Sequence, residues 1–81
     1  MLEDYSKAIS CYEQGLKIVQ KYKNHPEPAI QTSNHVAEFR HLLGLGIVYQ
    51  KINQPQESIK FLNSARAIYQ GLKNNPFLSP I

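Results

Sequence analysis

Eighty-one residues, of which 42% are hydrophobic and 19% charged, form one domain at most, and this modest charge excludes disorder driven by charge. The net charge of +3 comes from Lys and Arg residues scattered among acids, which is typical of a solvated surface and disfavours nucleic acid as a partner. The single cysteine, Cys11, excludes an intramolecular disulfide and suits a reducing compartment. Because no signal peptide and no apolar run of about 20 residues is present, we expect a soluble, cytoplasmic chain with no membrane partner.

The first predicted helix covers residues 4–23. Its apolar residues recur at spacings of three and four, which places them on one face of a helix. They are Tyr5, Ala8, Ile9, Tyr12, Leu16, Val19 and Tyr22. Cys11 and Ile18 fall off this face, which indicates contact on a second side. Pro26 and Pro28 prevent the helix from continuing.

The second predicted helix covers residues 33–52, although the sequence allows a start anywhere between Pro28 and Val36. Thr32, Ser33 and Asn34 are candidate N-caps. Its apolar residues cover more than one face, and a helix that is apolar on most sides is buried on most sides. We therefore expect this helix to lie between the other two.

The third predicted helix covers residues 55–73 and begins at Pro55, whose missing N–H costs nothing at the first helical position. The short turn before it makes the second and third helices antiparallel neighbours. The residues expected on its buried face are Ile59, Leu62, Ala65, Ile68 or Tyr69, and Leu72, with Phe61 beside them.

Residues 74–81 form a tail that contains two prolines and is nonetheless apolar. Its apolar residues are Phe77, Leu78 and Ile81. We expect them either to attach the tail to the helices or to mediate self-association. Either the tail folds back over the ends of the helices, or it is an extended segment that binds a partner.

The two ends of the chain match each other at an offset of 50 residues. Aligning Ala8 with Ser58 also aligns Ile9 with Ile59 and Gly15 with Ala65. Small residues at these positions allow helices to approach closely. We expect Gly46 to face Ser58 across the hairpin, and Gly15 and Ala65 to serve the next crossing.

At these residues the chain resembles the tetratricopeptide repeat family. Residues 39–70 are similar to one full repeat, and residues 4–20 to the second helix of a preceding one. The matching positions of the full repeat are Leu45, Gly46, Tyr49, Ser58, Leu62 and Ala65. The resemblance implies an all-α fold of α-solenoid type, in which a helical hairpin follows one further helix, within a domain of residues 1–73.

Two departures from the family pattern qualify the resemblance. The family period is about 34 residues, whereas the offset here is 50, so the helices are longer or a loop is inserted. Gln20 and Gln70 stand where the family often places proline. Both departures favour a longer-period variant of the repeat.

The resemblance implies a non-enzymatic protein–protein interaction module, an adaptor or scaffold that binds a partner peptide or helix. In this family the first helix of each pair lines the binding groove. The groove residues would here be Arg40, Leu43, Ile47, Gln50, Lys51 and Gln54. Alternatively, Leu43 and Ile47 pack against the first helix. Leu43, Gly44 and Ile47 replace the Lys/Asn clamp with which some members bind chaperone tails, so this ligand is disfavoured.

The sequence predicts no catalytic residue, cofactor or metal ligand. His25, His35 and His41 lack the spacing and the companion ligands of a zinc site and are expected in loops or at the surface. Cys11 has no activating motif near it. Glu13, Glu38 and Glu57 lie on separate helices and are expected to face water.

Two other functions remain open. The first predicted helix lacks a neighbour on one side, so two copies could pair through uncovered helix faces as a structural homodimer. Alternatively, the chain is a small helical nucleic-acid-binding regulator that uses Lys17, Lys21 and Lys23.

Overall fold

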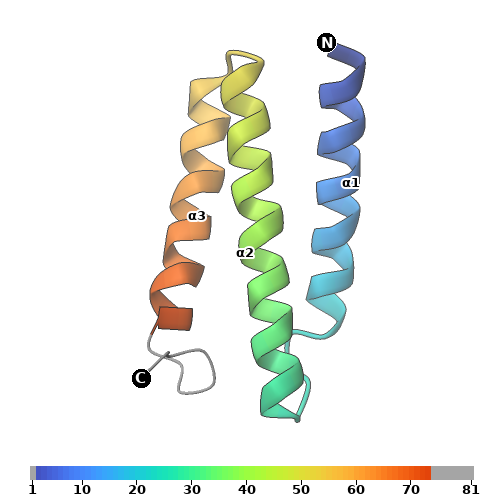
Figure 1. Cartoon of the computed structure of the whole chain (residues 1–81), viewed down its shortest axis with the longest axis vertical. Coiled ribbons are helices and arrows are strands. Elements are labelled where there is room, and N and C mark those ends of the chain that lie inside the picture. Colours follow the sequence, from blue (N-terminus) through green and yellow to red (C-terminus); the bar gives the residue numbers. More distant parts are fainter. Residues whose placement is uncertain (1, 74–81) are drawn as a thin grey trace.

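Three helices make up residues 2–73, the part of the chain that this computed structural model describes (Figure 1). α1 spans Leu2–Lys21, α2 spans Pro28–Lys51 and α3 spans Pro55–Lys73. α2 packs against α1 on one side and α3 on the other, and consecutive helices run in opposite directions. The all-α class, the helical hairpin and the central place of the second helix are thus confirmed. The apolar tail predicted for residues 74–81, with Phe77, Leu78 and Ile81, lies outside the described residues. Within residues 2–73, no helix is long and apolar enough to span a membrane.

The first helix ends two residues before the predicted residue 23, and the second starts at Pro28, the earliest start that the sequence allowed and five residues before residue 33. α1 ends at Lys21, and α2 begins at Pro28, so Thr32, Ser33 and Asn34 lie inside the helix and are not its N-caps. Pro28 can begin a helix because its ring fixes a helical φ and its missing N–H would have no partner there. His25 holds the connection to the start of α2. Its Nδ1 accepts a hydrogen bond of 3.1 Å from the backbone N–H of Glu27, and its carbonyl accepts one from the Gln31 side chain.

The turn between α2 and α3 forms as predicted, and α3 begins at Pro55. Asn53 adopts a left-handed φ of 63°, a conformation that asparagine tolerates better than most residues. The backbone N–H of Gln54 donates to the carbonyl of Tyr49 at 2.9 Å, which closes the end of α2. This turn brings the start of α3 directly against the end of α2.

Small residues lie at both helix crossings. Between α2 and α3, the Ser58 hydroxyl donates a buried hydrogen bond of 2.8 Å to the carbonyl of Gly46, which confirms that these residues face each other. Between α1 and α2, Gly15 leaves room for the ring of His41 and Gly44 leaves room for the ring of Tyr12. The expectation that Gly15 and Ala65 serve the same crossing is wrong, because Ala65, which is 2% exposed, lies between α2 and α3.

The core follows α2. Its buried apolar residues are Val19 of α1, Leu45 and Val48 of α2, and Ala65 of α3. The stripe predicted for α3 is wrong at its first position, because Ile59 is 57% exposed while its neighbour Ser58 is buried. Cys11 and Ile18 are both exposed, so the described part of the chain offers no second contact for that side of α1.

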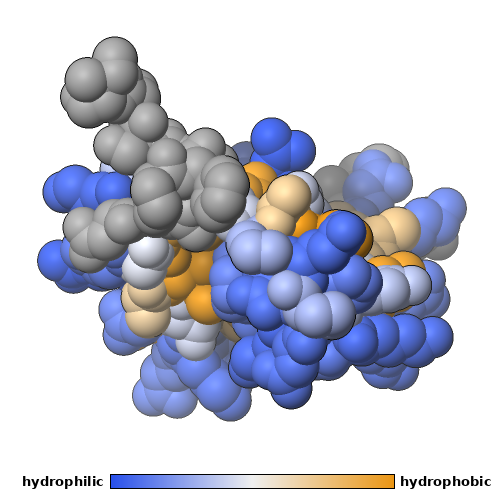
Figure 2. Space-filling model, turned by 90° about the horizontal axis from the view of Figure 1, so that it is seen from below, coloured by the Kyte–Doolittle hydropathy of each residue, from blue (hydrophilic) through white to orange (hydrophobic). Residues whose placement is uncertain are grey.

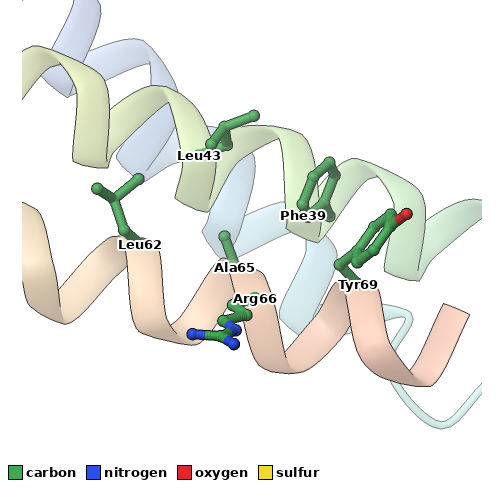
Figure 3. A pocket seen from close by; sticks show the side chains of 6 residues that line it. All are labelled: Phe39, Leu43, Leu62, Ala65, Arg66 and Tyr69. Atoms are coloured by element: carbon green, nitrogen blue, oxygen red, sulfur yellow. The ribbon is translucent and has the colours of Figure 1, made fainter. Parts of the chain in front are cut away.

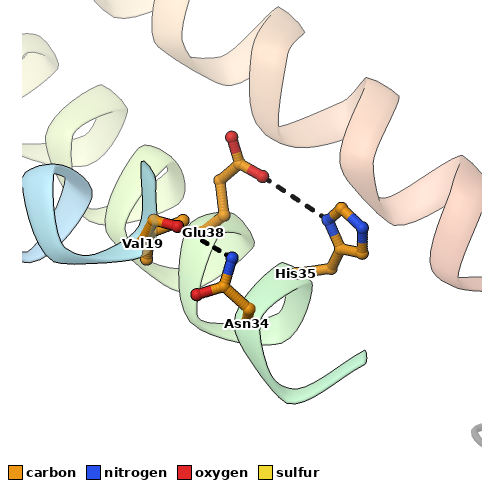
Figure 4. A network of polar contacts seen from close by, with 4 residues as sticks. All are labelled: Val19, Asn34, His35 and Glu38. Carbon is orange, nitrogen blue, oxygen red and sulfur yellow. Dashed lines mark hydrogen bonds and ion pairs between the residues drawn. The ribbon is translucent and has the colours of Figure 1, made fainter. Parts of the chain in front are cut away.

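Asn34 ties α1 to α2 through its side chain (Figure 4). Its Nδ2 donates a hydrogen bond of 2.9 Å to the backbone carbonyl of Val19, near the end of α1. In Asn34→Asp the carboxylate has no proton to donate and faces the carbonyl oxygen. We expect this variant to lose about 1–2 kcal/mol of unfolding free energy in urea denaturation. The neighbouring control Ser33→Ala, at an exposed position, should change it by less than about 0.5 kcal/mol. Equal losses would show that this hydrogen bond does not stabilise the α1–α2 contact.

Candidate protein-binding groove

An apolar groove runs between α2 and α3 (Figure 3). Its cavity has a volume of about 320 Å³. The lining residues are Phe39 and Leu43 from α2, and Leu62, Ala65, Arg66 and Tyr69 from α3. Five of these six side chains are apolar or aromatic, so the groove can hold a hydrophobic side chain of a partner.

The periodicity of the two helices explains why these residues meet. Phe39 and Leu43 are four residues apart on α2, and Leu62, Ala65 and Tyr69 follow a spacing of three and four on α3, so each set shares one face. At one end the rings of Phe39 and Tyr69 lie 5.8 Å apart at 37°. Because Ala65 is small, α3 leaves a hollow between Leu62 and Tyr69 instead of filling it.

The groove is open to solvent at Tyr69. This residue is 51% exposed, although its ring lies against the ring of Phe39. Tyr49 and Phe61 form a second aromatic contact between α2 and α3, with ring centroids 5.4 Å apart and an interplanar angle of 10°. Unlike Tyr69, both are half-buried. Hydrophobic residues also reach the surface when the molecule is seen from below (Figure 2). The exposed ring of Tyr69 is therefore available for contact with a partner.

The residues predicted to line a groove on α2 are not gathered around one cavity. Leu43 lines the groove against α3, and Gln54 lies in a separate hollow at the hairpin turn together with Pro55 and Glu57. Arg40, Gln50 and Lys51 are exposed. Ile47 is 42% exposed.

Two expectations about polar residues are wrong. Glu38 is only 8% exposed and does not face water; its Oε1 lies 3.6 Å from Nδ1 of His35 (Figure 4). His41 is not a surface residue: its ring packs against Gly15 and Tyr12, and its buried Nδ1 has no hydrogen-bond partner among the described residues. His41 lies on the side of α2 that α1 covers, and no sequence motif marks the burial of either residue.

The described helices hold no candidate site for metal chemistry. Within residues 2–73, no three His, Cys, Asp or Glu side chains lie close enough together to hold a metal ion. Cys11 is exposed on α1. We take the groove between α2 and α3 as the candidate functional site, because residues of both helices line it and most of them are apolar or aromatic.

Sequence reasoning missed most of the groove. It placed Leu62, Ala65 and either Ile68 or Tyr69 on a buried face of α3, and it assigned no role to Arg66. The available signal was the spacing of four residues between Phe39 and Leu43, which matches that between Ala65 and Tyr69 on the facing helix. Comparisons of the chain with protein-family models, curated proteins and solved structures each found no match.

Proposed function

We propose that this chain is a non-enzymatic protein–protein interaction module of the tetratricopeptide-repeat type. The open apolar groove between α2 and α3 carries the proposal, because it combines a cavity of about 320 Å³ with an aromatic side chain, Tyr69, that is 51% exposed. The small residues at the crossings, Gly46 and Ser58 between α2 and α3 and Gly15 between α1 and α2, support the repeat assignment. The partner is a protein segment that covers this groove.

Site-specific photo-cross-linking tests this function. A photoreactive residue is placed at Tyr69 in the groove and, as the control, at Lys60, which is exposed on the same helix but does not line the groove. In the native host we expect a discrete protein adduct from position 69 and none from position 60. Equal labelling from both positions, or no adduct from position 69, contradicts the proposed function.

Self-association is the second candidate function, and a feature of α1 favours it. Ile18 and Tyr22 are 57% and 49% exposed on or next to the side of α1 that no other described helix covers. Paired copies would bury both residues. This second function predicts that the mass from light scattering rises from one chain to two with concentration, and that Ile18→Glu prevents the rise. A constant monomer mass contradicts the homodimer.

A further inference from the structure

We propose that the groove between α2 and α3 takes the apolar face of an acidic amphipathic helix from a partner protein. The inference rests on the proposed function and adds the site and the chemical class of the partner. It depends on the spacing of the groove, on its charge, and on the charge of the exposed α1 surface, which is the surface that a second copy of the chain would offer.

The spacing of the groove suits a helix. Leu62 and Tyr69 are seven residues apart, which is two turns or about 10 Å of α3. Residues at i, i+4 and i+7 of a partner helix cover the same length, and an amphipathic helix uses such residues to dock in an apolar groove. Ala65 lies between Leu62 and Tyr69 and, because it is small and buried, forms the floor of the groove at its centre.

The groove belongs to a longer face of α3. Ile59, Leu62, Arg66, Tyr69 and Lys73 are three or four residues apart in succession, so they follow one stripe along the helix. Ile59 is 57% exposed at one end of the stripe, and Tyr69 is 51% exposed near the other. The stripe therefore combines apolar and aromatic side chains with two exposed cations, Arg66 and Lys73.

The exposed charge of α2 and α3 is one-sided, and Arg66 is the charged residue of the groove lining. α2 and α3 together carry five Lys and Arg residues, all exposed: Arg40, Lys51, Lys60, Arg66 and Lys73. Their two acids are withdrawn from solvent, because Glu38 is buried and Glu57 is half-buried. No carboxylate among residues 2–73 lies within ion-pair distance of Arg66. An acidic partner helix would supply one, and such complementarity selects the partner more than it raises affinity.

The same charges argue against a second copy of the chain as the occupant. The exposed apolar residues of α1 and the loop after it are Ile18 and Tyr22. Their sequence neighbours Lys17, Lys21 and Lys23 are exposed cations. Docking this surface against Arg66 and Lys73 would bring like charges together, which costs free energy.

A charge-swap experiment on the full chain tests the proposal. The probe is a synthetic alanine-based helix of about 15 residues, with leucines at i, i+4 and i+7 and glutamates beside them. A second probe carries lysine in place of each glutamate. The variants are Arg66→Glu and the matched control Lys60→Glu, which makes the same charge change on the same helix outside the groove. Circular dichroism confirms equal helicity of all proteins.

We expect the glutamate probe to bind the wild-type chain and to shift the NMR amide signals of residues 62–69. Arg66→Glu should weaken this binding by about tenfold and improve binding of the lysine probe, whereas Lys60→Glu should change both by less than about twofold at physiological salt. Tyr69→Ser should weaken both probes.

Other results overturn the proposal in distinguishable ways. Equal binding of the two probes, or equal effects of Arg66→Glu and Lys60→Glu, shows that Arg66 does not select an acidic helix. Failure of both probes, together with a cross-linked partner from position 69, leaves the interaction function standing and removes the acidic helix. An adduct whose mass equals two copies of the chain assigns the groove to self-association instead.

Discussion

Replacing Leu45 with alanine should lower the free energy of unfolding by about 3 kcal/mol. Leu45 is the largest side chain that is fully buried in the described part of the chain, with 0% exposure, and it lies in α2 between the two outer helices. Truncation removes apolar burial and leaves a cavity that the neighbours fill only in part, which costs about 2–5 kcal/mol in protein cores. Natural domains have a margin of only about 5–15 kcal/mol, and a small chain lies near the lower end.

Urea denaturation followed by far-ultraviolet circular dichroism measures this loss. The matched control is Ile59→Ala, because Ile59 is a comparable aliphatic residue that is 57% exposed on α3. We expect the control to lose less than about 1 kcal/mol, since most of its surface is already in water. Similar losses at the two positions would show that Leu45 is not the centre of the core.

The start of the third helix and the pairing of Gly46 with Ser58 could be predicted because each depends on local chemistry. Pro55 has no N–H to lose at a first helical position, and a short turn directs the next helix back along the previous one. Two small residues in adjacent helices then mark where the backbones approach. Each of these inferences can be made from the sequence without coordinates.

The start of the second helix could not be fixed in the same way. Pro28 disfavours helix in the residue before it and can itself begin a helix, and the polar residues Thr32 and Asn34 resemble caps although they lie inside α2. Asn34 has a tertiary role there, its hydrogen bond to the carbonyl of Val19. An asparagine that bonds to another helix cannot be told by sequence from one that caps its own.

The burial of individual residues on α2 and α3 was the weakest part of the sequence interpretation. α2 is apolar on several faces, so its pattern does not say which face stays open, and Leu43 is the one predicted groove residue that lines the groove against α3. On α3, Ser58 takes the buried position beside Gly46 because it is small and can donate to the carbonyl there. Ile59 is thereby turned outward. Close helix approach overrides hydrophobicity at such a crossing.

Gly46→Val should be strongly destabilising, by about 2–3 kcal/mol. An added Cβ at this position would lie 2.5 Å from Cδ2 and 2.7 Å from Cγ of Leu62, and the two further methyl groups of valine enlarge the clash. Overpacking of this kind costs about 1–3 kcal/mol, while the gain in helix propensity over glycine offsets only about 0.5 kcal/mol. Separation of α2 from α3 would also stretch the hydrogen bond from Ser58 to the Gly46 carbonyl.

Gly71→Val is the matched control, because it makes the same substitution in α3 at a position where an added Cβ meets nothing within 4 Å. There only the helix propensity changes, so this variant should be neutral or more stable by about 0.5 kcal/mol. The two variants should therefore differ by about 2 kcal/mol or more in unfolding free energy, which a pair of thermal or urea unfolding curves resolves. Since Leu62 also lines the groove, Gly46→Val should weaken ligand binding there even under conditions in which the protein stays folded. A stable Gly46→Val chain with an intact groove would mean that α2 and α3 do not depend on close approach at this residue.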